Sequence, residues 1–341
     1  MGIILSRPGI YTPENIITNS FLEKIIDTSD KWIIKRSGIK ERRISLNKGI
    51  REMGSLAAKK LLDQELITDQ KIDEIIFATN LHDQNKEFPS HAGYVANQID
   101  NPNAIASDIT AGCTGLIYAI RQAYNNMVAE PNLKKTLVVG GERLTDMTDY
   151  SDRTNCFLFG DGAGAYLLER LDNEEGIINN VIGGKSDIGS RKFPSGELSL
   201  ENKLGVKLIS DPKIEYNQIY LKQNYLVMNG KKVFEFAVPI MEHGVKKVLE
   251  NTKYNLEDVD AIIPHGANIR IIDSAKRKLE KNGFKGIIYT NLEKYGNTST
   301  ASVPIAADEA FKKEIIKKDD LIINVAFGAG FTWGANLYRA I

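Results

Sequence analysis

The chain has 341 residues, and its 44 lysines and arginines are balanced by 44 aspartates and glutamates. This length allows one large domain or two of medium size, and zero net charge provides no general attraction for nucleic acid or an anionic membrane. Two cysteines in such a chain exclude a disulfide scaffold and favour a reduced, cytoplasmic protein.

The first elements that the hydrophobic pattern predicts are an amphipathic helix at residues 53–62 and a buried strand at residues 72–80. The residues at the start carry no basic segment followed by a long apolar stretch, so no signal peptide is expected. A run of about 18 apolar residues is also absent from the sequence, which argues against a membrane-spanning helix.

Cys113 follows an apolar lead-in and stands next to Gly112, ahead of a predicted helix that runs to about Val128. Glycine allows a sharp turn and the close approach of a ligand. If Cys113 opens this helix, the free N–H groups and the positive end of the helix dipole favour a thiolate and lower the cysteine pKa to roughly 3.5–7.5. We therefore expect a nucleophile that accepts an acyl group. The alternative is a small buried cysteine at a tight strand–helix turn.

A second buried strand is predicted at residues 134–139, and a glycine-rich run follows at residues 160–164. A dinucleotide-binding fingerprint needs a preceding strand, a following helix and a later acidic residue. Here the glycines lead into a short apolar run instead, so close backbone packing is the better interpretation. Asp161 is expected to be structural, and Cys156 is expected to be a core residue.

A polar break at residues 172–176 predicts a boundary between an N-terminal half, residues 1–172, and a C-terminal half, residues 173–341. Beyond it, residues 183–224 are rich in glycine, serine, lysine and asparagine and match no other part of the chain. A long connection of this kind is either a lid that faces a substrate or an inert surface excursion. The sequence leaves both interpretations open.

The second half repeats the order of the first. Its predicted elements are a helix at 238–249, a buried strand at 259–265, a helix at 298–313 and a strand at 319–325. Several matches in the same order make a chance similarity of short apolar runs the weaker explanation. Continuous apolar strands between helices are typical of a mostly parallel sheet covered on both faces. The sequence therefore predicts an α/β protein made of two similar halves.

Two polar residues of the second half are candidates for chemistry. His265 ends a predicted strand and precedes a glycine, the position where open α/β sheets carry functional groups; a hydrogen-bonded loop histidine is the alternative. Asn297 could be the N-cap of the next helix, but it lies just before the point of the repeat that matches Cys113. Near the end of the last strand, Ala329 between two glycines could offer a backbone N–H to an oxyanion.

Six segments together carry a resemblance to a known family. They are residues 28–39 (TSDKWIIKRSGI), 108–120 around Cys113, 158–164 (LFGDGAG), 228–230 (MNG), 295–299 (YGNTS) and 327–334 (FGAGFTWG). In this order they resemble β-ketoacyl-acyl-carrier-protein synthase III, a family of thiolase-fold condensing enzymes, over nearly the whole chain. The resemblance implies a thiolase-like α/β fold in which two duplicated halves form five layers, α-β-α-β-α, and this agrees with the repeat.

The resemblance also implies a reaction. Cys113 would be acylated by an acyl-CoA primer, while His265 and Asn297 would hold the thioester oxygen of malonyl-acyl-carrier protein and stabilise the enolate formed on loss of carbon dioxide. The resulting carbanion would attack the acyl-cysteine and give a 3-oxoacyl-carrier protein, which initiates fatty-acid synthesis. The N–H groups of Cys113 and Ala329 would form a second oxyanion hole. The resemblance implies no metal and no redox cofactor.

Further positions match the family's substrate-binding residues. Those that match coenzyme A contacts are Trp32, Arg36, Arg153 and Asn268, while Arg270 matches a position for carrier-protein docking and Phe88 the base of the acyl pocket. In the family the residue at the Phe88 position reaches across a homodimer interface, so the resemblance implies a homodimer.

The chain departs from the family pattern at three positions near the candidate site. Gly266 replaces the usual glutamine, Ala329 replaces the usual middle glycine, and Thr114 replaces the usual alanine or serine. Residues 183–224 also look longer than usual. These changes leave the primer open, so a specialised pathway with another acyl donor or acceptor is the alternative to fatty-acid initiation.

Three other functions remain to be weighed. An acyltransferase with an oxygen or nitrogen acceptor would use the same acyl-cysteine without decarboxylation. A cysteine hydrolase fits less well, because the glycine directly before Cys113 departs from the G-x-nucleophile-x-G elbow. A non-catalytic scaffold is disfavoured by the three reactive groups in repeat-matched places.

Overall fold

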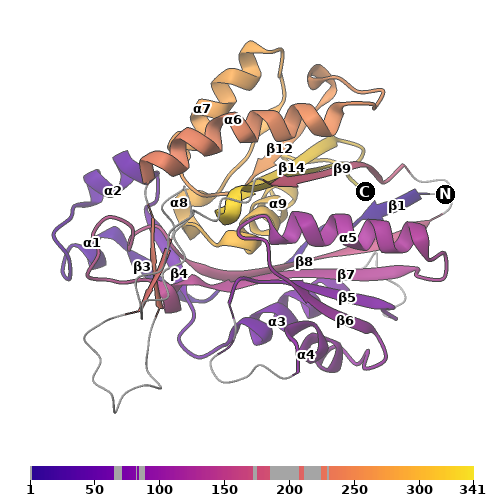
Figure 1. Cartoon of the computed structure of the whole chain (residues 1–341), viewed down its shortest axis with the longest axis horizontal. Coiled ribbons are helices and arrows are strands. Elements are labelled where there is room, and N and C mark those ends of the chain that lie inside the picture. The colour runs from indigo at the N-terminus through magenta and orange to yellow at the C-terminus, as the bar shows by residue number, and fades with distance from the viewer. Residues whose placement is uncertain are drawn as a thin grey trace, which may run out of the picture.

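The computed structural model describes residues 2–64, 71–81, 83, 89–171, 175–184, 207–210, 224–228 and 230–341. Two β-sheets alternate with three layers of helices (Figure 1). The outer helices of the first sheet are α3 (Ile50–Leu62) and α4 (His91–Gln98), the helices between the sheets are α5 (Gly115–Ala129) and α9 (Ser302–Lys312), and the outer helices of the second sheet are α6 (Gly230–Leu249) and α7 (Ile269–Lys281). The five-layered thiolase-like arrangement is thus confirmed.

The first sheet has the strand order β1-β8-β7-β5-β6, and β2 also pairs with β8. Its strands are β1 (Gly2–Leu5), β2 (Gly9–Tyr11), β5 (Glu74–Ala78), β6 (Ile105–Ile109), β7 (Lys135–Arg143) and β8 (Asp161–Leu171). β5 runs parallel to both β6 and β7, whereas β8 is antiparallel to β7, β1 and β2.

The second sheet has the order β13-β12-β14-β15-β9. Its strands are β9 (Ile177–Gly184), β12 (Ala261–Pro264), β13 (Ile287–Ile288), β14 (Leu321–Gly328) and β15 (Thr332–Arg339). Only β13, β12 and β14 are mutually parallel; β15 is antiparallel to β14 and to β9. The prediction of mostly parallel sheets is therefore wrong. A three-residue turn, Ala329–Phe331, joins β14 to β15, and so short a connection joins only antiparallel strands.

Smaller elements frame the two sheets. They are the strand pairs β3 (Asn15–Thr18) with β4 (Glu41–Ile44) and β10 (Lys207–Ser210) with β11 (Asn224–Val227), the helices α1 (Asn19–Leu22), α2 (Asp30–Ser37) and α8 (Leu292–Tyr295), and the 3-10 helices η1 (Leu144–Met147), η3 (Leu256–Asp258), η4 (Ser299–Ala301) and η5 (Ala329–Phe331).

The internal repeat is visible as matched elements. In chain order, α3, β5, α5 and β7 of the first half correspond to α6, β12, α9 and β14 of the second. β8 ends at Leu171 in the first sheet and β9 begins at Ile177 in the second. The boundary at residues 172 and 173 stays a prediction, because residues 172–174 lie outside the described part. Most of residues 183–224 also lies outside it, so the choice between a lid and a surface excursion stays open.

The two central helices are fixed by a core that both sheets share. From α5, Leu116 and Ile120 are fully buried, and α9 adds a row of small residues, Ala306, Ala307 and Ala310. Small side chains allow helices and sheets to approach closely, and a core packed in this way resists displacement. As a result, the loops that precede α5 and α9 are held close together.

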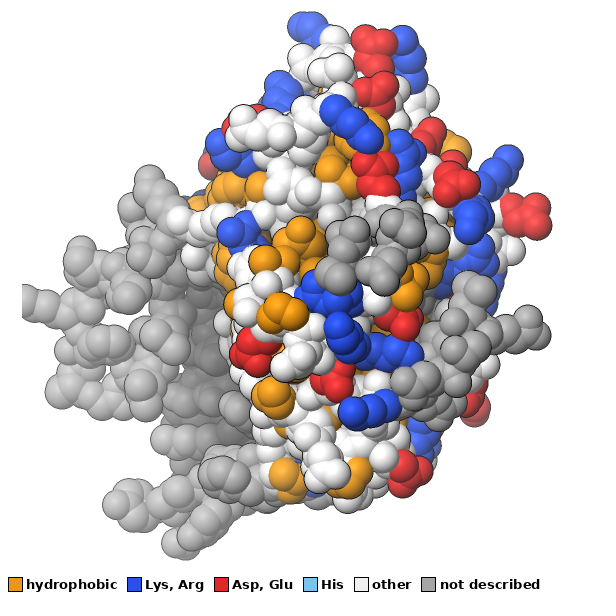
Figure 2. All heavy atoms as spheres, turned by 90° about the vertical axis from the view of Figure 1, so that its right-hand side faces the viewer, with side chains coloured by type: hydrophobic (Ala, Val, Ile, Leu, Met, Phe, Trp, Pro, Cys, Tyr) orange, Lys and Arg blue, Asp and Glu red, His pale blue; other side chains and the backbone are white. Residues whose placement is uncertain are grey.

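The described surface mixes both signs of charge. Figure 2 shows the end of the molecule near both chain ends, where Lys and Arg side chains lie among Asp and Glu side chains. Within the described ranges, the helices all lack the combination of length and apolar character that crossing a membrane requires.

Candidate active site

The three residues that the sequence singled out for chemistry share one cavity. Cys113, His265 and Asn297 all line a space of about 330 Å³. Cys113 lies between β6 and α5, His265 directly follows β12, and Asn297 lies between α8 and η4. Because equivalent loops of the two halves meet here, each half contributes part of one site. We call this space the inner cavity.

Close backbone packing places Ala329 beside Cys113. Gly112 has a left-handed φ of +59°, and a Cβ there would lie 2.8 Å from the carbonyl oxygen of Ala329. A Cβ on Gly328 would lie 2.6 Å from the backbone nitrogen of Cys113. Real Cβ atoms do not approach so closely, so both positions require glycine. The two loops therefore bring the backbones of Cys113 and Ala329 to the wall of the same cavity.

The electrostatic setting of Cys113 differs from the prediction. Helix α5 begins at Gly115 with Thr114 as its N-cap, so Cys113 lies just outside the helix. Burial is the main cause that raises the pKa of the Cys113 thiol to about 11; the Ser299 side chain acts in the opposite direction, and the Glu142 charge adds to the rise. The expectation of a lowered pKa is therefore wrong, and the resting thiol is protonated.

Access, rather than acidity, separates the two cysteines. Burial raises the pKa of Cys156 to about 11 as well. Cys156 is only 1% exposed, as expected of a core residue, whereas Cys113 is partly exposed and lines the inner cavity. Only Cys113 is thus reachable by a substrate in that cavity.

His265 is neutral and held by a serine. It is 1% exposed, and burial lowers its pKa to about 3. Its Nδ1 lies 2.7 Å from the Ser302 hydroxyl, which also contacts the carbonyl oxygen of Ser299 at 2.8 Å. A hydroxyl has one proton, so donation to Ser299 makes Ser302 accept from Nδ1–H, and Nε2 then has a lone pair. Donation to Nδ1 instead places the proton on Nε2. Ser302 thus controls the tautomer of His265.

The carboxamide of Asn297 is oriented by the backbone around it. Its Oδ1 accepts a hydrogen bond from the N–H of Ser299 at 2.9 Å, which leaves Nδ2 as a donor for the cavity. The backbone N–H of Asn297 donates to the carbonyl oxygen of Leu158 at 2.7 Å, and its carbonyl oxygen accepts from the N–H of Gly160 at 3.0 Å. Helix α9 begins only at Ser302, so Asn297 is not its N-cap.

The glycine-rich run at residues 160–164 has the structural role that the sequence predicted. A Cβ on Gly160 would lie 2.3 Å from the carbonyl oxygen of Tyr295. Asp161 is fully buried and accepts hydrogen bonds from the backbone N–H groups of Ser45 (2.8 Å) and Thr145 (3.0 Å) and from the Thr145 hydroxyl (2.7 Å). This run therefore joins the two halves by backbone packing.

Glu142 is a site residue that the sequence analysis missed. It lies near the carboxyl end of β7, is 0% exposed and has a pKa that burial raises to about 7. An acidic residue shortly after a continuous apolar run, at the edge where open α/β sheets carry functional groups, was the available signal. The missed Ser302, in contrast, carries no such signal.

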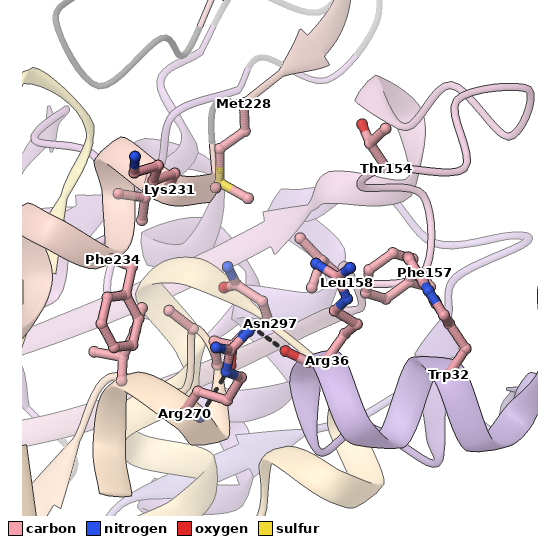
Figure 3. Close-up of a pocket in the computed structure, with 15 residues that line it drawn as sticks. Trp32, Arg36, Thr154, Phe157, Leu158, Met228, Lys231, Phe234, Arg270 and Asn297 are labelled. Carbon is pink, nitrogen blue, oxygen red and sulfur yellow. Dashed lines mark hydrogen bonds between the residues drawn. The ribbon is translucent and has the colours of Figure 1, made fainter. Parts of the chain in front are cut away.

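A second cavity, of about 450 Å³, adjoins the first (Figure 3). Its wall includes Trp32, Arg36, Asn268 and Arg270, four of the residues expected to bind substrates, and also Lys231, which was not predicted. It shares Met228, Val233, Ala267 and Asn297 with the inner cavity. We call it the outer cavity, and Asn297 lies where the two meet.

Two arginines flank the indole of Trp32. The guanidinium carbons of Arg36 and Arg153 lie 5.2 and 5.5 Å from the ring centre, and the ring of Phe157 meets the indole edge-on at 5.2 Å. Arg153 also pairs with Asp27 at 2.7 Å. Cations at these distances are attracted by the ring face, so the half-buried indole and the two exposed arginines form an aromatic and basic platform.

Asn268 has a structural function that the sequence did not suggest. Its Oδ1 caps helix α7 by accepting from the N–H of Arg270 at 3.0 Å, and its Nδ2 donates to the carbonyl oxygen of Arg36 at 3.0 Å. It therefore ties α2 to α7 along the outer cavity. Phe88, expected at the base of the acyl pocket, lies outside the described residues.

Comparisons with known proteins agree over the whole chain. The family model for 3-oxoacyl-[acyl-carrier-protein (ACP)] synthase III matches residues 107–186, and the model for its C-terminal part matches residues 249–340. A β-ketoacyl-[acyl-carrier-protein] synthase III of Clostridium acetobutylicum is 42% identical over 331 residues, covering 97% of this chain and 96% of that protein. The chain belongs to the β-ketoacyl-acyl-carrier-protein synthase III family.

Two solved structures, one of a synthase III and one of a priming β-ketosynthase, share the fold. The crystal structure of the Aquifex aeolicus 3-oxoacyl-[acyl-carrier-protein] synthase III is 38% identical, with a TM-score of 0.83, covering 99% of this chain and 100% of that one. The priming β-ketosynthase of the R1128 polyketide biosynthetic pathway is 28% identical, with a TM-score of 0.84, covering 99% and 96%. Both are similar along their full lengths.

Membership of the synthase III family makes the chain an acyltransferase. Gly266 stands where the family pattern has glutamine. A Cβ on Gly266 would lie 3.8 Å from Leu292 and from Ser302, which is ordinary van der Waals contact. The backbone therefore does not require glycine here. Among the described residues, no group of three or more His, Cys, Asp or Glu side chains is arranged to hold a metal ion.

Proposed function

We propose that this synthase III family member condenses an acyl-CoA primer, through acyl-Cys113, with malonyl-acyl-carrier protein and so initiates fatty-acid synthesis. The observation that carries the proposal is the shared inner cavity, lined by an accessible thiol, a neutral imidazole and an oriented carboxamide. Nucleophile and hydrogen-bond donors are the parts that two successive thioester reactions need.

The first half-reaction uses the loop at Cys113. Its sulfur attacks the thioester carbonyl of the primer, and the backbone N–H groups of Cys113 and Ala329 hold the oxyanion. The close contact between Gly112 and Ala329, and between Gly328 and Cys113, supports this assignment. Donors fixed in advance in a dry cavity are worth far more than in water. Coenzyme A leaves, and the acyl group remains on Cys113.

The second half-reaction uses the C-terminal half. Asn297 Nδ2 and His265 Nε2 donate to the thioester oxygen of the malonyl group, so that loss of carbon dioxide gives a stabilised enolate. For His265 to donate from Nε2, the Ser302 hydroxyl must turn toward Nδ1, which lies 2.7 Å away. The carbanion then attacks the acyl thioester, and the Cys113 thiolate is released with formation of the 3-oxoacyl-carrier protein.

The outer cavity suits coenzyme A and the carrier protein. Trp32, with Arg36 and Arg153 at its faces, provides stacking and charge for a nucleotide end. Arg270 and Lys231 line the same cavity and would attract an acidic carrier protein. Asn268 lies in the same cavity wall, in keeping with the family pattern. The position of Phe88 at the base of the acyl pocket remains a prediction.

A homodimer in the cytoplasm is the further part of the proposal. β6 is the last strand of the first sheet as described, and its Ile105 is 54% exposed. An exposed apolar edge strand readily pairs with another chain. A second copy that pairs through β6 would extend the sheet and cover this edge. The two cysteines of the chain are both free, as expected for a reducing compartment.

The proposed reaction is tested by following two products at once. The protein is incubated with acyl-CoA primers of two to ten carbons and malonyl-carrier protein, and carbon dioxide and the mass of the carrier protein are measured. Equal amounts of carbon dioxide and 3-oxoacyl-carrier protein are expected. Acyl transfer to an oxygen or nitrogen acceptor without carbon dioxide would contradict the proposal. A strong preference for an unusual primer or acceptor would favour a specialised pathway, as the similarity to the R1128 enzyme suggests.

A further inference from the structure

A carboxylate lies buried behind the inner cavity without a role in the reaction described so far. Glu142 accepts hydrogen bonds from both halves of the molecule. From the end of β5 come the side chain of Asn80 (2.6 Å), its backbone N–H (3.2 Å) and the hydroxyl of Thr79 (3.3 Å). From η4 come the hydroxyls of Ser299 and Thr300, both at 3.3 Å. All of these donors are neutral, so the carboxylate is solvated by hydrogen bonds without a cationic partner among them.

Ser299 connects this carboxylate to the nucleophile. Its hydroxyl donates to Oε1 of Glu142 at 3.3 Å, and Ser299 lines the inner cavity together with Cys113. Ser299 also has a φ of +48°, a backbone conformation that non-glycine residues rarely adopt. Strained residues of this kind persist where the surrounding structure enforces them, often at functional sites. The hydroxyl is thus bonded to the carboxylate and belongs to the wall of the cavity that also contains the thiol.

We propose that Ser299 and Glu142 form a relay that takes the proton from Cys113 when the primer binds. This inference rests on the proposed acylation of Cys113. The thiol proton moves to Ser299 Oγ while the Ser299 hydroxyl proton moves to Glu142, so the S–H bond breaks and an O–H bond forms on the carboxyl group. The sulfur then bonds to the primer carbonyl, the carbon–sulfur bond to coenzyme A breaks, and the proton returns by the same path to the departing coenzyme A thiolate. Charge and protons balance.

The protonated thiol of Cys113 needs a base before it can attack the primer. A thiol whose pKa burial raises to about 11 requires a base near neutral pH. His265 shares the cavity, but burial lowers its pKa to about 3, which makes it a weak base. The pKa of Glu142, raised by burial to about 7, is better matched to the task. Arg143, next in the chain, pairs with Asp146, and Cys113 and His265 are ionisable groups of the inner cavity wall.

A purely electrostatic role for Glu142 predicts the opposite effect of mutation. The Glu142 charge raises the pKa of Cys113, so Glu142→Gln would make the thiol more reactive if charge alone mattered. If Glu142 is the base, the same substitution makes Cys113 less reactive. The sign of the change therefore separates the two roles.

The experiment measures alkylation of Cys113 by iodoacetamide between pH 5.5 and 9, in a Cys156→Ser background. This probe needs no acyl-CoA, so failure of the relay and failure of the proposed function are distinguishable. In the parent, the rate should rise with an apparent pKa near 7, because Glu142 must be ionised. Glu142→Gln and, as a second variant, Ser299→Ala should lose this step and react at least about tenfold more slowly at pH 8.

The matched control is Glu74→Gln. Glu74 is another buried glutamate of the first sheet, hydrogen-bonded to Asn126 and Thr136 at the opposite end of β5. This variant should keep the step near pH 7. The rate of primer acylation should follow the alkylation rate in every variant. Faster alkylation in Glu142→Gln, or an unchanged step in both Glu142→Gln and Ser299→Ala, would overturn the relay.

Discussion

The inner and outer cavities of this protein differ in charge, and the difference indicates how the work is divided. In the inner cavity, burial raises the pKa of Cys113 to about 11 and lowers that of His265 to about 3, so both groups are neutral at pH 7. The outer cavity is lined by exposed cations, Arg36, Lys231 and Arg270. We therefore assign the bond-forming steps to the inner cavity, where the reactive side chains are neutral, and the binding of charged substrates to the outer cavity, where cations are exposed.

The largest effect is expected at Cys113, because it forms the covalent intermediate. Cys113→Ser should lower kcat/KM for condensation at least about a thousandfold. Cys156→Ser, which changes a buried thiol outside the cavity, should keep most of the activity. Steady-state rates with one primer and malonyl-carrier protein check this, and comparable losses in the two variants would remove the distinction between reactive and core cysteine.

His265 and Asn297 should affect the second half-reaction most. Loss of one oriented donor typically costs about 10²–10³ in rate, so His265→Ala and Asn297→Ala should release carbon dioxide from malonyl-carrier protein that much more slowly. Acylation of Cys113 should change far less. Stopped-flow acylation and carbon dioxide release, measured on the same preparations, test this division. Equal losses in both steps would instead make His265 a general base.

Ser302 should show an intermediate effect, because it acts through His265. Ser302→Ala removes the hydroxyl 2.7 Å from Nδ1 and leaves the tautomer unfixed, so condensation should slow by about tenfold with little change in KM. Ser302→Thr keeps the hydroxyl and should restore the rate. Imidazole ¹⁵N chemical shifts of His265 should move in Ser302→Ala alone. Unchanged shifts in that variant would show that Ser302 does not set the tautomer.

The outer cavity should give the smallest effect, and one that depends on salt. Arg270→Glu should raise KM for the carrier protein several-fold, and the effect should weaken as ionic strength screens the charge. Acylation by the primer should be nearly unchanged. Arg277→Glu is the matched control, since Arg277 is exposed on the same helix, α7, and is not part of the cavity wall. A change in kcat without a change in KM would contradict a docking role.

The sequence predicted the elements of this site better than its electrostatics. The repeat located Cys113, His265 and Asn297 because matching loops precede matching helices, and the structure places all three at one cavity. The lowered pKa of Cys113 was inferred from neighbouring glycines and a helix, which are local features. Burial and the Glu142 charge, which raise it, come from distant segments and leave no local pattern.

The direction of the strands shows the same limit. Continuous apolar runs predicted buried strands correctly, yet β8 and β15 are antiparallel to their neighbours. Such runs report burial on both faces and say nothing of direction. The glycines around Ala329 were interpreted as an oxyanion loop, although the three residues of η5 also make the turn that reverses the chain.

The central claim is that the acyl group waits on Cys113, in the neutral cavity, until the malonyl group arrives. Intact-protein mass spectrometry with peptide mapping tests it most directly, first after acyl-CoA is added and again after malonyl-carrier protein. One acyl group per chain, on Cys113, is expected in the first spectrum, and its loss together with carbon dioxide release is expected in the second. An adduct on Cys156, no adduct, or an adduct that malonyl-carrier protein does not discharge would contradict the account.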